Sequence, residues 1–531
     1  MSTIISHPPT KPGTKSWIWW AILNAGLLVI PFWVADFLPL TDLPQHVAQA
    51  KMLLEALSDG ADSPYTIQWL TPYSLAYVVM LIAWKIGTPM LTGKIAFSIV
   101  MMLNVLTLHW FVRNSKGTSA TAVLGSLFFY SAVLYWGFFQ FFFGFFIFLI
   151  WLHIIEWRPE KQWTQFPLIL SVSTALYFSH ILWCAAGCTV LLIYDISKRL
   201  PMKTVLLRWS MLIPVSVFFL IWYPQLLESS FNSATRWSTF PWERLFKIRQ
   251  WPDLFLGGLT GYWETCVFVS AMVWGGLSIW QRRSLPPRKP VLYAAVLFLV
   301  LCTSLPYLYQ NTILFHQRWA PFSMILLLAA IPESVQRTSI LKMKQAAVWG
   351  LAILHTALTS AAWIAFDTRD MDGMEEVLRD VPDNVRVIGL SYIYKSDLFD
   401  HYPFIQSFAY CQVVHGDTLN FSFADFKPSL VVYREPRFQR NPDYKPDLST
   451  EGGGAPFMGW QSGLEWSPFR FTPRDAWFFD YAVVHGDDEL HAFFQRSPFL
   501  EHMGGSEVWQ LYRVRHSAYK KSMIPEKKHA I

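Results

Sequence analysis

Charge is scarce in this chain. Only 15% of its 531 residues are Asp, Glu, Lys or Arg, whereas 53% are hydrophobic and 17% aromatic. So low a charged fraction excludes an ordinary soluble globular protein, and several apolar runs approach the roughly 20 residues that cross a bilayer. The first run, Trp17–Leu38, has no small-residue cleavage site after it, so we expect a retained span and not a removed signal peptide.

Cysteine and the common catalytic motifs are also scarce. Of five cysteines only Cys411 lies in the polar C-terminal region, which argues against a disulfide there. That region contains no phosphate-cradling glycine loop, nucleophile elbow or zinc-type spacing. The stretch His485–Asp488 has metal-ligand residue types, but it follows a predicted strand and we interpret it as a turn. The sequence thus identifies no metal ligands, although a divalent metal is not excluded.

Residues 17–365 contain eleven apolar runs that are candidate membrane spans. They are Trp17–Leu38, Leu91–Val112, Ala120–Tyr135, Phe138–Trp157, Phe166–His180, Ile181–Tyr194, Val205–Glu228, Trp263–Trp280, Val291–Tyr309, Ile313–Ile331 and Ala346–Ala365. With residues 1–16 cytoplasmic, the inner loops collect most of the cations, as the positive-inside rule requires. A rival count makes Thr71–Gly87 a span and fuses the two short helices around His180; it leaves the final orientation unchanged.

The chain after residue 365 is a different kind of sequence, richer in Pro, Gly and Asp. Strand-like runs appear at Val385–Leu390, Ser429–Tyr433, Asp480–His485 and Val508–Val514, and a helical stretch at Met371–Asp380 precedes the first. We predict that residues 366–515 form an extracytoplasmic α/β or α+β domain, followed by a basic, flexible tail at 516–531.

Polar side chains gather on the predicted outer face, in the outer loops 39–90 and 229–262 and at the outer ends of spans. They are Asp42, His46, Gln140, His180, Arg236, Trp237, Trp242, Arg244, His316 and Arg318. Because ionisable groups at membrane depth are costly, their convergence indicates a functional cavity.

Each of these residues also has a structural interpretation. Asp42 can cap the amphipathic helix that follows it, and His180 can cap a short helix. Gln140 can be a polar contact inside an aromatic helix, and Arg318 can extend its head group to the interface. The cations of loop 229–262 can be an ordinary solvated surface.

In arrangement, residues 17–365 resemble the GT-C superfamily of membrane glycosyltransferases. The likeness rests on an acid early in the first outer loop (Asp42), on TPYSLAYVVMLIAWKIG and TGKIAFSIVMMLNVLTLHWFVRNSKG after it, on Gln317–Pro321 (QRWAP), and on a final W-x-LYR strand at Trp509–Arg513. Many members carry two adjacent acids where this chain has Thr41-Asp42, and a second acid where it has Gln140.

The resemblance implies a bacterial inner-membrane enzyme that transfers a sugar from a polyprenyl-phosphate donor to an extracytoplasmic acceptor, a lipid, glycan or protein, with no nucleic acid partner. Asp42 would be the base that takes the acceptor proton. The leaving phosphate needs fixed positive charge, and a sugar ring needs flat aromatic faces. The candidates for these two roles are His316, Arg318, Arg236 and Arg244, and Trp237 and Trp242.

Two other functions remain open. A transporter or flippase of a lipid-linked precursor would bind in the same cavity without reaction, but the sequence shows no internal repeat and no paired broken spans. A non-catalytic scaffold of an envelope polysaccharide assembly would explain the missing second acid.

Overall fold

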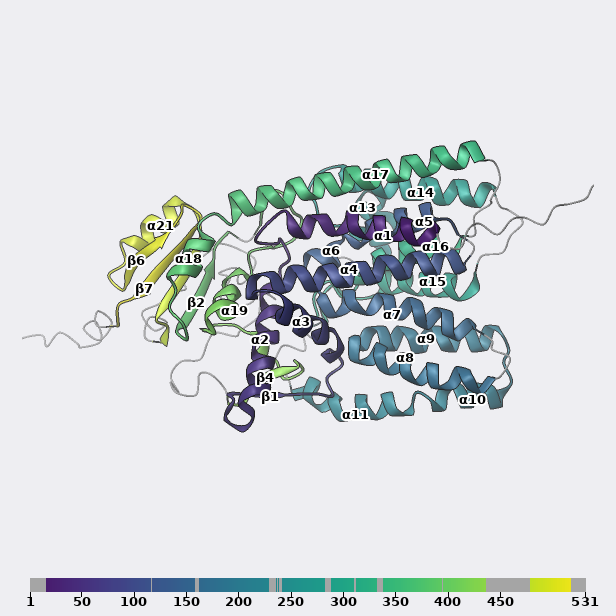
Figure 1. Ribbon diagram of the computed structural model, residues 1–531, viewed down its shortest axis with the longest axis horizontal. Coiled ribbons are helices and arrows are strands. Elements are labelled where there is room, and N and C mark those ends of the chain that lie inside the picture. The colour runs from purple at the N-terminus through teal and green to yellow at the C-terminus, as the bar shows by residue number, and fades with distance from the viewer. Residues whose placement is uncertain are drawn as a thin grey trace, which may run out of the picture.

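The computed structural model describes residues 16–115, 117–157, 162–228, 235, 237, 241–281, 288–309, 312–331, 338–393, 395–435 and 478–516. Most of them form helices that run side by side along the longest axis of the molecule, and a small β-sheet lies beyond one end of these helices (Figure 1). We call the sheet end the outer end and the opposite end the inner end, after the orientation that the sequence predicts.

The long-axis helices differ widely in length. Their bounds are α1 Ser16–Val29, α4 Pro89–Asn114, α5 Ser119–Ser126, α7 Phe139–Glu156, α8 Gln165–Ser179, α9 Ile181–Ser197, α10 Met202–Ser210, α11 Ile213–Glu228, α14 Trp263–Gln281, α15 Lys289–Ser304, α16 Ala320–Ala330 and α17 Thr338–Ala365. Within the described residues, three stretches are long and apolar enough to cross a membrane: α4, α7 and Met343–Asp370. The pair α10 and α11, bent by 46°, makes a fourth if it forms one span. The helical architecture is therefore confirmed, but eleven spans are not.

Some expected spans are interrupted. The one over Val291–Tyr309 ends at Ser304, because the next residue precedes Pro306 and adopts the extended backbone that this position favours. The one over Ala120–Tyr135 breaks after α5 into a 3-10 turn and the short helix α6 (Ala132–Tyr135).

The turn predicted at His180 is confirmed. The backbone of His180 is extended (φ −172°, ψ 132°) between the end of α8 and the start of α9. Its Nδ1 accepts a hydrogen bond from the Leu182 N–H over 3.2 Å, so the ring caps α9, as its structural interpretation proposed.

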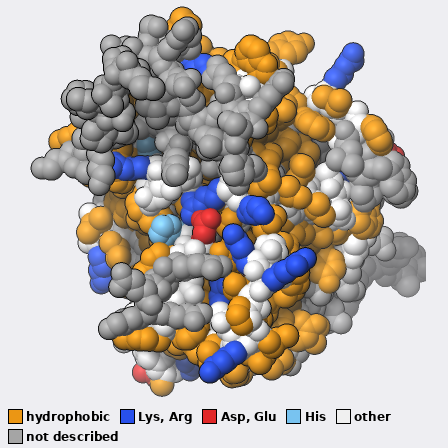
Figure 2. All heavy atoms as spheres, turned by 90° about the vertical axis from the view of Figure 1, so that its right-hand side faces the viewer, with side chains coloured by type: hydrophobic (Ala, Val, Ile, Leu, Met, Phe, Trp, Pro, Cys, Tyr) orange, Lys and Arg blue, Asp and Glu red, His pale blue; other side chains and the backbone are white. Residues whose placement is uncertain are grey.

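The inner end of the helices is basic. Figure 2 looks onto it and shows Lys and Arg side chains among hydrophobic ones. Arg288 donates to Glu156 and to the Ser115 hydroxyl, and the Arg113 guanidinium lies 5.3 Å from the ring centre of Trp17. This distribution is the one that the positive-inside rule predicts for a cytoplasmic end.

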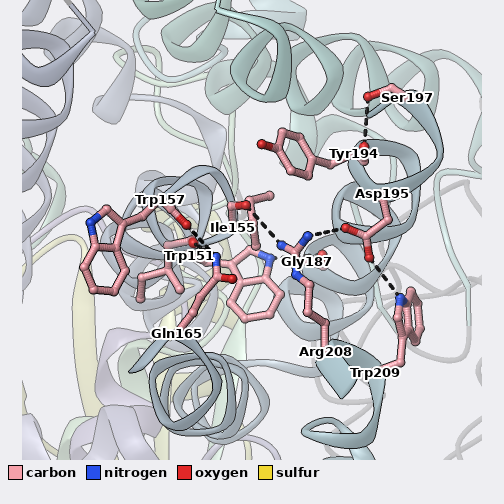
Figure 3. Close-up of polar contacts among 11 residues, drawn as sticks. Trp151, Ile155, Trp157, Gln165, Gly187, Tyr194, Asp195, Ser197, Arg208 and Trp209 are labelled. Atoms are coloured by element: carbon pink, nitrogen blue, oxygen red, sulfur yellow. Dashed lines mark hydrogen bonds and ion pairs between the residues drawn. The ribbon is translucent and has the colours of Figure 1, made fainter. Parts of the chain in front are cut away.

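A buried ion pair joins three helices near the inner end (Figure 3). Arg208 of α10 donates to the Asp195 carboxylate of α9 and, over 3.0 Å, to the Ile155 carbonyl of α7. The Trp209 indole N–H donates to the other oxygen of Asp195 over 3.3 Å. Because both charges are almost fully buried, the pair fixes the mutual positions of these helix ends.

The first outer loop forms a layer between the long helices and the sheet (Figure 1). It contains α2 (Leu43–Asp59), β1 (Tyr65–Ile67) and α3 (Ser74–Ile86). The second outer loop contains α12 (Pro241–Phe246) and α13 (Trp251–Phe255).

The C-terminal region carries the small mixed sheet that the sequence predicts. Its strand order is β3-β2-β5-β7-β6, in which β2 runs parallel to β3 and β5, and β7 runs antiparallel to β5 and β6. The bounds are β2 Arg386–Ser391, β3 Thr418–Leu419, β5 Tyr481–His485, β6 Leu500–Gly505 and β7 Trp509–Val514, with helices α18 Met374–Asp380, α19 Tyr410–His415 and α21 Asp488–Gln495. The turn after His485 is confirmed, since Asp487 caps α21.

One predicted strand lies elsewhere. The run at Ser429–Tyr433 forms β4 (Val431–Tyr433), which pairs antiparallel with β1 of the first outer loop. Beside it, Gln49 of α2 donates to the Val431 carbonyl over 3.0 Å and accepts from its N–H over 3.1 Å. Gln45 in the same way donates to the Phe421 carbonyl and accepts from the Phe423 N–H. The backbone of the C-terminal region is thus joined to glutamine side chains of α2.

Candidate functional site

The backbone holds Asp42 at the outer end of the helices. The Asp42 N–H donates to the Trp136 carbonyl over 3.1 Å, and the Thr41 N–H donates to the Tyr135 carbonyl over 3.0 Å. Gly137 follows with a left-handed backbone (φ 72°), and a Cβ there would lie 2.9 Å from the Asp42 nitrogen. Only glycine tolerates both the left-handed backbone and the absence of space for a Cβ. The turn before α7 therefore packs directly against the Asp42 backbone.

The Asp42 side chain is partly buried and does not act as a helix cap. Asp42 occupies the N-cap position of α2, but its carboxylate makes no capping hydrogen bond. Burial raises the pKa of this carboxyl from 3.8 to about 7, and the charge of Arg318 acts to lower it. A carboxyl with such a pKa can take up and release a proton near neutral pH.

Arg318 supplies a positive charge that acts on Asp42. Its side chain is 7% exposed, its Nε donates to the Ile313 carbonyl over 3.1 Å, and its guanidinium carbon lies 3.6 Å from the ring centre of Phe138. The stacking ring and the single backbone bond hold the guanidinium while leaving most of its N–H groups for other acceptors. The position is buried, so Arg318 is not a head group extended to the interface.

Arg318 also lies within electrostatic reach of Tyr73 and His180. The rings of these two residues meet edge to face with centres 5.0 Å apart. His180 therefore combines its capping role with a place beside the charged pair.

A buried neutral network lies beside Asp42. His46 Nδ1 lies 3.0 Å from the Tyr77 hydroxyl and 3.2 Å from Gln140 Nε2, and Gln140 Nε2 lies 3.1 Å from that hydroxyl. The backbone N–H of His46 donates to the backbone carbonyl of Asp42 over 3.0 Å. Burial lowers the pKa of His46 to about 3, so its ring is neutral at physiological pH. This network can position Asp42 but not exchange protons for it. We call the whole set the Asp42 cluster: Asp42, His46, Tyr73, Tyr77, Gln140, His180 and Arg318.

The other predicted site residues do not join this cluster. Arg244 Nη1 donates to carbonyls at the C-terminal end of α15, the shortest bond being 2.6 Å to Leu305. Its charge acts on His316, whose ring packs against Tyr307. Trp237 is 48% exposed. Arg236 and the side chain of Trp242 lie outside the described residues.

The donors of the Asp42 cluster do not suit a divalent metal. Hard divalent cations take several oxygen ligands, usually with more than one carboxylate. Among the described residues this cluster offers one carboxylate, Asp42, and the positive charge of Arg318 already acts on it. The fixed positive charge here is that of Arg318.

The sequence analysis missed Tyr73 and Tyr77. They stand four residues apart, a spacing that places two side chains on one face of a helix. That spacing was the available signal, but tyrosine is so common in this chain that it did not distinguish them.

No protein-family model matches the chain, and no curated protein matches it. Two similar solved structures are those of ArnT from Cupriavidus metallidurans, in the apo state and bound to undecaprenyl phosphate. Each is 10% identical, with a TM-score of 0.49. The alignment covers 94% of this chain and 98% of the apo chain, and 95% and 99% for the lipid-bound one. At this identity the chemistry of the Asp42 cluster rests on its own residues.

Proposed function

We propose that this chain is a GT-C-type membrane glycosyltransferase that moves a sugar from a polyprenyl-phosphate donor to an extracytoplasmic acceptor. The observation that carries the proposal is the electrostatic interaction between Asp42 and the buried guanidinium of Arg318. A carboxyl with a pKa of about 7 and a buried guanidinium are the two groups that this reaction needs.

Asp42 acts as the general base. The acceptor hydroxyl oxygen attacks the anomeric carbon of the donor sugar, and its proton passes to the Asp42 carboxylate. Positioned bases contribute about 10²–10⁴-fold to such steps. The protonated carboxyl then returns its proton to water, a transfer that a pKa near neutrality makes fast in both directions.

Arg318 stabilises the leaving group. The bond between the anomeric carbon and the phosphate oxygen breaks, and both electrons leave with the lipid phosphate. The guanidinium offers parallel N–H donors to two phosphate oxygens, a geometry that a lysine cannot provide. Its stacking on Phe138 fixes this geometry before the substrate arrives.

The remaining features support a bacterial inner-membrane location, with the N-terminus cytoplasmic and the C-terminal region extracytoplasmic. The basic inner end agrees with this orientation. The Asp42 cluster lies at the opposite end, where α2 meets the C-terminal region. The acceptor would then reach Asp42 from the extracytoplasmic side.

The test separates reaction from binding. Asp42→Asn and, as a matched control, the exposed Asp62→Asn are purified in lipid nanodiscs. Undecaprenyl phosphate binding is measured by native mass spectrometry, and transfer with radiolabelled polyprenyl-phosphate sugars. We expect Asp42→Asn to lose about 10²-fold or more of transfer while binding the lipid normally.

If Asp42→Asn transfers sugar at the unaltered rate, Asp42 is not the general base. Lipid binding without transfer in the unaltered protein, for every sugar tried, would favour the transporter. Absence of both would favour the scaffold.

A further inference from the structure

A short segment of the C-terminal region, Leu398–Tyr402, is hydrogen-bonded to both outer loops. We call it the strap; it belongs to the connection between β2 and α19. On the side of the second outer loop, the Thr260 N–H donates to the Leu398 carbonyl over 3.1 Å, and the Asp400 N–H donates to the Gly258 carbonyl over 3.0 Å. The strap is thus fixed to that loop through its backbone.

Two further bonds of the strap reach the residues that lead into Asp42. His401 Nε2 lies 2.8 Å from the Pro39 carbonyl oxygen, and the Thr41 hydroxyl donates to the Tyr402 carbonyl over 3.1 Å. Pro39 and Thr41 stand three residues and one residue before Asp42 in the chain. The strap therefore holds the backbone that precedes Asp42, while the turn before α7 holds Asp42 itself.

The bond to Pro39 determines which nitrogen of His401 carries a proton. A carbonyl oxygen only accepts, so Nε2 is the donor of this bond. The ring is 2% exposed, and burial lowers the pKa of His401 from 6.5 to about 3, so the ring is neutral at physiological pH. A neutral imidazole has a single N–H. That N–H is used to hold the Pro39 carbonyl.

The His401 ring also packs against two aromatic rings. Its centre lies 5.1 Å from that of Tyr135 and 5.2 Å from that of Phe399. Tyr135 belongs to α6, and its carbonyl accepts from the Thr41 N–H. The hydrogen bond and the packing are separate properties of one side chain, so substitutions can remove them one at a time.

We propose that His401 is a positioning residue for Asp42, whose carboxyl it keeps in place by holding the Pro39 carbonyl. Between the end of the 3-10 turn at Trp33 and the start of α2 at Leu43, the chain forms no helix or strand. The conformation of this stretch therefore depends on bonds to other segments. The proposal rests on the proposed function only for its effect on transfer, because the environment of Asp42 is measurable without a substrate.

Loss of the His401 bond would let Asp42 move towards water. A displacement of about 1 Å at a reacting group can lower a rate about 10²-fold. It would also reduce the burial of Asp42, which is the main cause of its raised pKa, so this pKa should fall from about 7 towards 3.8. Arg318→Gln acts in the opposite direction, because it removes the charge that lowers the same pKa.

Two substitutions separate the hydrogen bond from the packing. His401→Gln keeps an N–H donor near the place of Nε2 but loses the ring, whereas His401→Phe keeps a ring but loses the donor. The matched control is His415→Phe, since His415 Nε2 also lies close to a carbonyl of the C-terminal region, that of Leu378 at 2.6 Å, but stands outside the strap. Each full-length variant is purified in lipid nanodiscs, together with Asp42→Asn.

Infrared spectroscopy reports the environment of Asp42 directly. The carbonyl band of the protonated Asp42 carboxyl, identified as the band that Asp42→Asn removes, is followed against pH. We expect the same midpoint in the unaltered protein, His401→Gln and His415→Phe, and a proton affinity about tenfold lower or more in His401→Phe. Transfer should fall about tenfold or more in His401→Phe and stay within a few-fold in His401→Gln, with undecaprenyl phosphate binding unchanged in both.

The order of the two variants decides the question. A normal midpoint in His401→Phe with an altered one in His401→Gln would mean that only the packing matters and would overturn the proposal. So would a loss of transfer in His415→Phe equal to that in His401→Phe, because general destabilisation would then explain both.

A second variant keeps the test decisive if His401→Phe does not fold. Thr41→Val removes the other bond of the strap with little change of shape and should lower the Asp42 midpoint in the same direction. An unchanged midpoint in Thr41→Val would then overturn the proposal. A lowered midpoint supports the positioning role even if the unaltered protein shows no transfer, a result that would contradict the proposed function alone.

Discussion

Asp42 and Glu264 are both carboxylates at the outer ends of helices, but the chain holds them in opposite ways. Glu264 accepts three backbone hydrogen bonds of 2.7–2.8 Å. Asp42 stands at an N-cap position without making the capping bond, and its environment offers a guanidinium and burial. An acid whose lone pairs are occupied by amides keeps its place. An acid left without such donors keeps the capacity to exchange a proton.

The comparison predicts its largest effect at Arg318. Arg318→Gln removes the positive charge that acts on Asp42 and should lower transfer about 10²–10³-fold, the usual cost of losing one fixed donor at a developing oxyanion. Lys247→Gln removes an exposed cation of the second outer loop and should leave the rate within a few-fold. The kcat of both variants is compared at saturating lipid donor; a smaller loss for Arg318→Gln than for Lys247→Gln would contradict the assignment.

The second effect concerns stability. Glu264→Gln replaces one accepting oxygen by an NH₂ group that meets a backbone N–H, and should cost about 2 kcal/mol, the penalty for leaving a buried donor without an acceptor. Asp42→Asn should cost nothing, since burial already disfavours its charge. The apparent Tm of both variants tests this. A larger loss in Asp42→Asn would reverse the comparison.

The third effect is a pH dependence. Asp42 has a folded pKa of about 7, above its ordinary 3.8, so the folded state binds more protons between these values. Its contribution to stability is therefore full below about pH 4 and is lost as the pH rises through 7. Transfer should show the opposite trend, rising towards pH 7 as the base loses its proton. In Arg318→Gln the rising limb should move to higher pH, because Arg318 lowers the pKa of Asp42. A pH-independent rate between 5 and 8 would exclude Asp42 as the titrating base.

The smallest effect is expected in the neutral network. Tyr77→Phe removes the hydroxyl that meets both His46 and Gln140, and should reduce stability by about 1 kcal/mol. Transfer should fall only a few-fold, since the network positions Asp42 and does not exchange protons. Urea or thermal melts and kcat measure the two effects separately. A loss of transfer as large as that in Arg318→Gln would assign Tyr77 a direct part in the reaction.

The features predicted correctly from the sequence are those that depend on neighbouring residues in the chain. Asp42 and His46 were singled out because an acid and a histidine follow an apolar run, and His180 because a short apolar pair needs a turn. All three depend on residues within one or two helical turns. The small C-terminal sheet was also predicted, from short strand-like runs in the sequence.

Long-range partners explain what the sequence did not predict. Arg244 was a candidate phosphate ligand, but it binds carbonyls at the end of α15, and no local signal distinguishes these two uses of a guanidinium. Asp400 reaches Glu264 only through the packing of the C-terminal region on the helices, a contact between residues far apart in the chain. The broken spans show that apolar composition alone does not decide where a helix stops.

The glutamine contacts of α2 set the order in which the protein can mature. The Gln49 side chain forms hydrogen bonds with the Val431 backbone, and β1 pairs with β4. The helix α2, which begins next to Asp42, therefore gains these contacts only after residue 433 has been synthesised. Domains generally fold in the order of their synthesis. Here the proposed base emerges from the ribosome among the first residues and yet belongs to one of the last parts of the structure to be completed. An unfinished chain would carry the acid beside a helix that still lacks part of its support.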